Sequence, residues 1–225
     1  MTGLVVAALS AREVGRRRTA LLLVIALPLC FYLVRRDLPG QSTRLLAIGI
    51  GWAVATLTLF VVNASRSLDP RLRLAGASVV EIIGGRLLAM TGIGVTLAVA
   101  YWGLVGVSQH DLARPWGVGA MLLLTALVAA PFGGLIAALL PRELEGALAL
   151  LIVCATQLLA DPDGMAAKLM PFWSARSLGN YTVDAAPTTA LWQALLHAAA
   201  TWLLCTVATL ALFARRLRLA RYPEP

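Results

Sequence analysis

Long apolar runs separated by polar connections dominate the pattern of hydrophobic and polar positions along the chain. The runs cover residues 19–34, 45–64, 87–108, 117–140, 144–160 and 190–213. A helix needs about 20 apolar residues to cross a hydrocarbon core of about 30 Å. Glu145, at one end of its run, is the only formal charge inside them. Since no barrel-like alternation occurs, the pattern predicts an all-α polytopic membrane bundle with six transmembrane helices.

Residues 1–18 predict a separate amphipathic helix lying in the membrane interface. One helical face carries Arg12, Glu13, Arg16 and Arg17, and the opposite face carries Leu4, Ala8, Ala11 and Val14. Glu13 and Arg17 have the i,i+4 spacing of a favourable ion pair. A frayed tail is the alternative. The predicted transmembrane domain is then 19–213, and 214–225 forms a tail.

Composition supports a membrane protein and changes how the positive charge is interpreted. Apolar residues make up 60% of the chain and charged residues only 13%. These values exclude an ordinary soluble enzyme and a free-standing nucleic-acid binder. The net charge of +8 comes from arginines at the ends of the apolar runs, where they suit anionic lipid headgroups. Membrane lipids are therefore expected partners, and nucleic acid is not.

The distribution of basic residues predicts the orientation. With six spans, 13 of the 19 basic residues fall on the side of the two termini and 6 on the other side. The positive-inside rule then places both termini in the cytoplasm. The connection 65–86 is cytoplasmic in this arrangement, and the connection 161–189 is external. The expected location is the cell membrane.

The sequence lacks the usual motifs of catalysis and of nucleotide or metal binding. The only lysine, Lys168, follows Ala167, so a G-x-x-x-x-G-K-[ST] loop is impossible. His110 and His197 have no metal-site spacing, and the three cysteines lie inside apolar runs. We therefore expect no catalytic residue, metal or cofactor on this chain.

A polar stripe in the last apolar run is the candidate for a substrate pathway. Gln193, His197 and Thr201 are four residues apart, and Gln157 lies in the preceding run. Polar side chains within a membrane helix face the bundle or a water-filled path. The stripe therefore indicates either a substrate-facing patch or hydrogen bonds between helices.

The order of these features resembles the type-2 ABC exporter permeases. A basic amphipathic helix leads into a first span with Pro28 near its middle. Residues 69–89, DPRLRLAGASVVEIIGGRLLA, are similar to the first cytoplasmic loop of that family. Pro171, Phe172 and Trp173 are similar to the proline–aromatic element of its external loop. The chain departs from the family just after the second span, where Ser65, Arg66, Ser67 and Asp69 replace the usual acidic pair.

The resemblance implies a transport subunit rather than an enzyme. It implies pairing with a second copy or a related permease, and two separate ATPase subunits that bind ATP and Mg²⁺. A short helix in the connection 65–86 would dock on the ATPase. The external connection would hold short helices that cap the pathway, often re-entrant, with residues 171–173 as the cap. The residues implied in ATPase coupling are Arg71, Leu72, Arg73, Leu74, Gly76 and Glu81.

Two other functions are alternatives to the exporter subunit. An intramembrane lipid-modifying enzyme needs clustered carboxylates, histidines or serines at membrane depth. A membrane carrier that is not coupled to ATP needs buried acidic residues for ion coupling. The apolar runs offer almost none of these groups, so the exporter subunit is the preferred interpretation.

Overall fold

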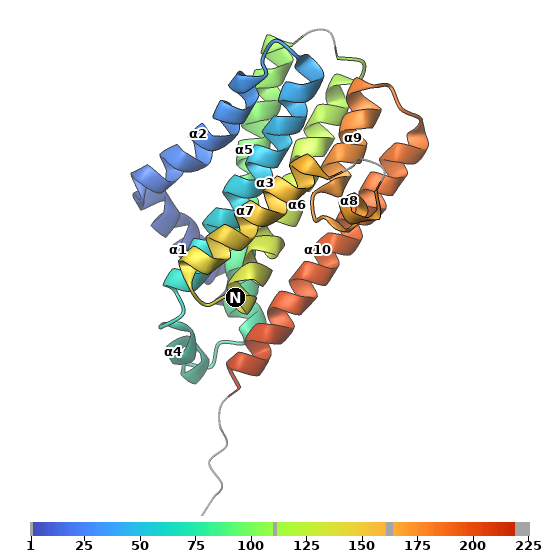
Figure 1. The fold of residues 1–225 in the computed structure, drawn as a ribbon. Helices are drawn as coiled ribbons and strands as arrows, with labels where there is room; N and C mark the ends of the chain where they lie inside the picture. Colours follow the sequence, from blue (N-terminus) through green and yellow to red (C-terminus); the bar gives the residue numbers. More distant parts are fainter. Residues whose placement is uncertain (1, 110–111, 161–163, 219–225) are drawn as a thin grey trace, which may run out of the picture.

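The structure is a computed structural model that describes residues 2–109, 112–160 and 164–218. Within this part the chain forms helices and no strand (Figure 1). The elements are α1 (Thr2–Arg16), α2 (Arg18–Val34), α3 (Pro39–Ala64), α4 (Asp69–Leu74), the π-helical turn η1 (Val80–Gly84), α5 (Gly85–Ser108), α6 (Pro115–Leu139), α7 (Glu143–Leu159), α8 (Met165–Leu169), α9 (Trp173–Val183) and α10 (Thr188–Arg216).

Several of these helices are long and apolar enough to cross a membrane. Four candidate spans satisfy both criteria within the described residues, Gly40–Ala64, Val80–Ser108, Pro115–Leu139 and Thr188–Arg216. A fifth is possible if α1 and α2, which meet at a bend of 84°, count as one broken span. The prediction of an all-helical fold with several helices able to span a membrane is confirmed, and the number of six spans stays a prediction.

Each of the six predicted apolar runs coincides with a helix, namely α2, α3, α5, α6, α7 and α10. The shortfall from six spans comes from helix length. Both α2 and α7 have 17 residues, or about 25 Å of helix, which is shorter than a hydrocarbon core of about 30 Å. The observed α3 begins at Pro39, before its predicted start at 45, because a proline suits the first turn of a helix.

Close packing of α3 against α6 forms the centre of the bundle. Gly133 of α6 lies directly on the backbone of α3, since a Cβ added there would be 2.2 Å from the carbonyl oxygen of Ala55. Pro28 of α2 packs in the same way on Gly49. Small residues let helix backbones approach closely where lipid provides no hydrophobic force. Gly49 and Gly133 thus mark close contacts between helix backbones.

One end of the bundle gathers α1, α4 and both described ends of the chain (Figure 1). Helix α1 packs there against η1 and α5. The predicted Glu13–Arg17 ion pair is present, with 2.6 Å between Oε1 and Nη2. Of the predicted apolar face, Val14 is buried and Leu4 is 70% exposed. The face packed against the protein is Gly3, Val6, Ala7, Ser10 and Val14. The location of α1 in the membrane interface stays a prediction.

Candidate functional site

The connection between α3 and α5 is a compact, strongly anchored structure. Helix α4 ends in a left-handed residue, Gly76, at φ +89°. The Ala77 N–H donates to the carbonyl oxygen of Leu72, and the Gly76 N–H to that of Arg73. This is a Schellman termination, for which glycine is the preferred residue. Gly76 therefore forms the tight turn that ends α4.

A buried ion pair fixes α4 to the start of α5. Arg86 Nη2 lies 2.6 Å from Asp69 Oδ1, and both side chains are at most 3% exposed. Nearby, Arg66 donates to the carbonyl oxygen of Ala137 on α6. Burial, followed by the positive charge of Arg216, lowers the pKa of Arg66, whereas Asp69 raises it. These contacts join the connection to two helices of the bundle, α5 and α6.

Glu81, which is among the residues predicted to act in coupling, caps a helix start. Its carboxylate accepts hydrogen bonds from the N–H and the Oγ of Ser78, both at 2.9 Å. The Glu81 N–H donates to Ser78 Oγ at 3.1 Å. This reciprocal pattern is a capping box. The S-x-x-E spacing at 78–81 was present in the sequence and could have revealed it.

The other predicted coupling residues differ in their accessibility. Leu74 is 75% exposed and Arg71 is also exposed. Leu72 instead packs against the chain's own core, and Arg73 donates to the carbonyl oxygen of Ala77. We call the exposed residues Leu68, Arg71 and Leu74 the α4 face; Ser67, Pro70, Ala75 and Gly76 of the same connection are exposed as well.

The predicted cap carries a phenylalanine that reaches deep into the bundle. Phe172 is 1% exposed. Its ring meets that of Phe132 edge-on at 5.8 Å, and a Cβ at Gly51 would touch it at 3.1 Å. Gly51 lies about 18 Å along α3 at about 1.5 Å per residue. Phe172 is thus near the middle of the bundle rather than at its rim.

Helix α9 returns from this depth to the end opposite the termini. There a Cβ added at Gly40 of α3 would meet Val183, and one at Gly117 of α6 would meet Thr182. Helix α9 therefore runs between α3, α6 and α10, whereas α8 is exposed except at Ala167. Residues 161–163 of the external connection lie outside the described part.

The predicted pathway residues do not share one cavity. The Oε1 atom of Gln157 accepts a hydrogen bond from the Phe172 N–H at 3.2 Å. His197 Nε2 lies 3.1 Å from the carbonyl oxygen of Lys168, and its ring packs on Trp173. Thr201 is half-buried and Gln193 is exposed. Gln157 and His197 therefore hold the α8–α9 segment from two sides.

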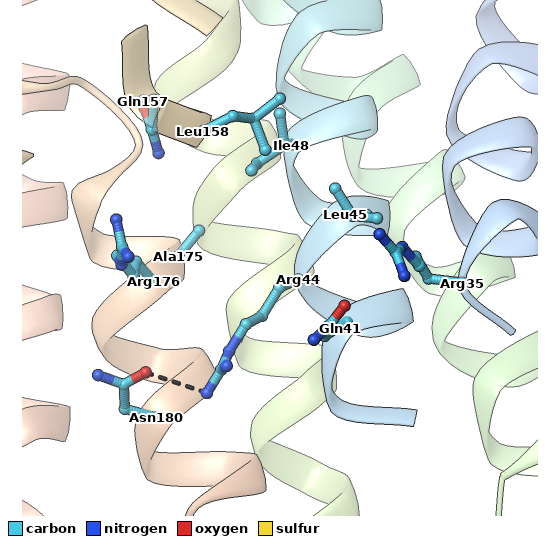
Figure 2. Close-up of a pocket in the computed structure, with 10 residues that line it drawn as sticks. All are labelled: Arg35, Gln41, Arg44, Leu45, Ile48, Gln157, Leu158, Ala175, Arg176 and Asn180. Carbon is cyan, nitrogen blue, oxygen red and sulfur yellow. Dashed lines mark hydrogen bonds between the residues drawn. The ribbon is translucent and has the colours of Figure 1, made fainter. Parts of the chain in front are cut away.

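A basic pocket lies between α3, α7 and α9 at the end opposite the termini (Figure 2). Its volume is about 700 Å³. Arg44 crosses it from α3 toward Asn180 on α9, and Gln157 contributes from α7. We call it the arginine pocket. It is lined by Arg35, Gln41, Arg44, Leu45, Ile48, Gln157, Leu158, Ala175, Arg176 and Asn180.

The sequence predicted one member of this pocket, Gln157, and missed the arginines. The only signal was basic residues on the side where the orientation rule disfavours them. Arg35, Arg44 and Arg176 come from three separate stretches of sequence, and no spacing relates them. Within the described residues no group of His, Cys, Asp and Glu forms a potential metal site.

Comparison with known proteins adds no relative on which to base a function. No protein-family model matches the chain, and no curated protein matches its sequence.

Proposed function

We propose that this chain is the membrane subunit of an ATP-driven ABC exporter. The α3–α5 connection gives the main support for this proposal, because it combines an accessible helix with rigid attachment to the bundle. ATP would bind on separate subunits, since the sequence has no P-loop. The Asp69–Arg86 ion pair and the Arg66 contact give α4 the stiffness that transmission of force requires.

The proposed subunit has six spans with both termini in the cytoplasm. Helices α2 and α7 are short, but a short span is accommodated by local thinning of the bilayer. Helix α1 would lie in the inner interface, which the 84° bend before α2 permits. Arginines concentrate at the end that holds α1 and α4, as the positive-inside rule requires.

The active unit would contain a second permease, either an identical copy or a related chain, and two ATPase subunits. We assign the α4 face to ATPase contact. Leu74 would enter an apolar groove, and Arg71 would pair with an acidic group of the ATPase. Residues 171–173 would close the external side of the pathway, with Phe172 as the buried plug.

Copurification of the tagged chain from its native membrane tests this proposal. We expect a P-loop ATPase to accompany the chain, and Leu74→Asp to remove it. An apolar anchor replaced by a charge in a groove would lower the affinity by several kcal/mol. Leu72 is unsuitable for this test. Because Leu72 is partly buried in the chain's own core, a substitution there could release the ATPase by destabilising the chain.

Leu144→Asp is the matched control. Leu144 is 72% exposed, close to the 75% of Leu74, and it lies after Arg142 at the same end of the bundle. This variant should retain the ATPase. Absence of any ATPase from the wild-type preparation, or equal retention by both variants, would contradict the assignment.

A further inference from the structure

The charge of the arginine pocket is incompletely balanced by the protein. Arg44 pairs with Asp184 at 2.5 Å. Arg176 donates to the carbonyl oxygen of Ala160 at 3.2 Å. Among the described residues, no carboxylate lines the pocket and no ion pair reaches Arg35 or Arg176. Asp161 and Asp163 lie outside that part of the chain. Within the described part of the chain, the pocket therefore presents two guanidinium groups, those of Arg35 and Arg176, that form no ion pair.

The pocket lining changes from polar to apolar with depth along α3. Gln41, Arg44, Leu45 and Ile48 share one helical face because their spacing follows the helical repeat. Gln41 and Arg44 lie nearer the start of α3, Leu45 lies toward Arg35, and Ile48 lies deeper, beside Leu158 of α7 (Figure 2). A molecule with a charged head and an apolar tail has the same gradient.

We infer that the arginine pocket binds the phosphate headgroup of an amphiphile, with its acyl chain along Leu45, Ile48 and Leu158. Guanidinium groups form paired, charge-assisted hydrogen bonds with phosphate oxygens. The amides of Gln41 and Asn180 add neutral hydrogen-bonding groups. The volume of about 700 Å³ lies within the usual size of small-molecule pockets, about 300–1,000 Å³.

This binding would be a property of the chain by itself. It requires no ATPase and no assumption about transport direction, so its failure would leave the exporter proposal intact. Likewise, loss of ATPase copurification would leave this inference untouched. The site differs from the α4 face in position, since the two lie at opposite ends of the bundle.

Phosphatidic acid with a fluorophore at the end of its acyl chain is a suitable probe. Fluorescence anisotropy would follow its binding to the purified chain in dodecyl maltoside micelles. Unlabelled phosphatidic acid, phosphatidylcholine with the same acyl chains, and inorganic phosphate would be the competitors. We expect phosphatidic acid to displace the probe. Phosphatidylcholine and inorganic phosphate should each need at least about a hundredfold higher concentration, because the choline of phosphatidylcholine cancels the headgroup's net charge and inorganic phosphate has no acyl chain.

Substitutions distinguish binding in the arginine pocket from binding to surface charge elsewhere. Arg35→Gln and Arg176→Gln should each weaken binding of the probe about tenfold, the order expected for loss of a charged hydrogen bond. Arg176→Lys keeps the charge but loses the forked geometry, and its effect should be intermediate. Arg36→Gln is the control, because Arg36 is an exposed neighbour that does not line the pocket.

Three results would overturn the inference. Equal competition by phosphatidylcholine would mean that the net negative charge of the headgroup is not recognised. Equal competition by inorganic phosphate would indicate a site for free anions only. An equal loss from Arg36→Gln would assign the binding to surface charge. If Arg176→Gln lowers the thermal midpoint of the ligand-free protein, Arg35→Gln and Arg176→Lys decide the outcome instead.

Discussion

Asp69 and Arg86 carry the least solvated charges among the described ion pairs. Their side chains are 2% and 3% exposed, whereas Arg142 and Glu145 at the same end are 81% and 45% exposed. A buried pair gains little net stability over apolar residues, but removal of one partner leaves an uncompensated charge. The burial of Asp69 and Arg86 therefore makes each residue dependent on the other.

Asp69→Asn should lower the free energy of unfolding by about 3–5 kcal/mol, because Arg86 stays buried without its counter-charge. Glu145→Gln breaks an exposed pair and should cost about 0–1 kcal/mol. Denaturant titration in mixed micelles measures both values. The double change Asp69→Leu with Arg86→Met should recover most of the loss. If Asp69→Asn costs no more than Glu145→Gln, Arg86 is not held by charge.

The contact between α3 and α6 shows what glycine contributes to an element. The side chain of any other residue at Gly133 would overlap the backbone of Ala55, and backbone cannot rotate away as a side chain can. Gly92 on α5 has no atom within 4 Å of an added Cβ. The two glycines lie in helices of similar length. A side chain at Gly133 has no room, whereas one at Gly92 meets open space.

Gly133→Ala should therefore separate α3 from α6 and destabilise the protein by about 1–3 kcal/mol or more, as overpacking does. Gly92→Ala should be neutral or stabilising by up to about 1 kcal/mol, because alanine suits a helix better than glycine. Thermal midpoints of the two purified variants in detergent test this difference. Equal midpoints would contradict a close backbone contact at Gly133.

Phe172 is the buried side chain that we expect to hold α9 in the bundle. Phe172→Ala removes a ring packed against Phe132 and should cost about 3–5 kcal/mol, the range for a fully buried aromatic side chain. Phe60 is 37% exposed, so Phe60→Ala should cost less. Amide hydrogen exchange would show which helix is loosened. We expect faster exchange in α9 for Phe172→Ala and not for Phe60→Ala. Unchanged exchange in α9 would show that Phe172 does not hold this helix.

Apolar patterning predicted the long helices because lipid forces continuous helical backbone. It could not predict the course of α8 and α9, whose polar sequence suits a surface loop. Ser174, Arg176 and Asn180 enter only because α3, α6 and α10 surround them. The Ser78–Glu81 capping box was readable from its spacing. The Asp69–Arg86 pair and the arginine pocket depend on the packing of elements distant in sequence, which no local pattern records.

The whole molecule has two chemically different ends, and the proposed orientation assigns a side of the membrane to each. With Cys30, Cys154 and Cys205 replaced, Ala75→Cys and Asp37→Cys provide exposed probes at opposite ends. A membrane-impermeant maleimide should label position 37 in intact cells and position 75 only after the membrane is opened. Position 37 is a better outer probe than the region around Phe172, which is buried. The reverse labelling pattern would invert the proposed topology.

The depth of Phe172 has a consequence for biosynthesis. Helix α9 is too polar to enter lipid alone, and α10, which forms one of its walls, is synthesised after it. The ribosome therefore delivers α9 before one of its walls exists. We expect α9 to take its place between α3 and α6 only when α10 has been made. A nascent chain stalled before α10 would then leave Phe172 without its full enclosure.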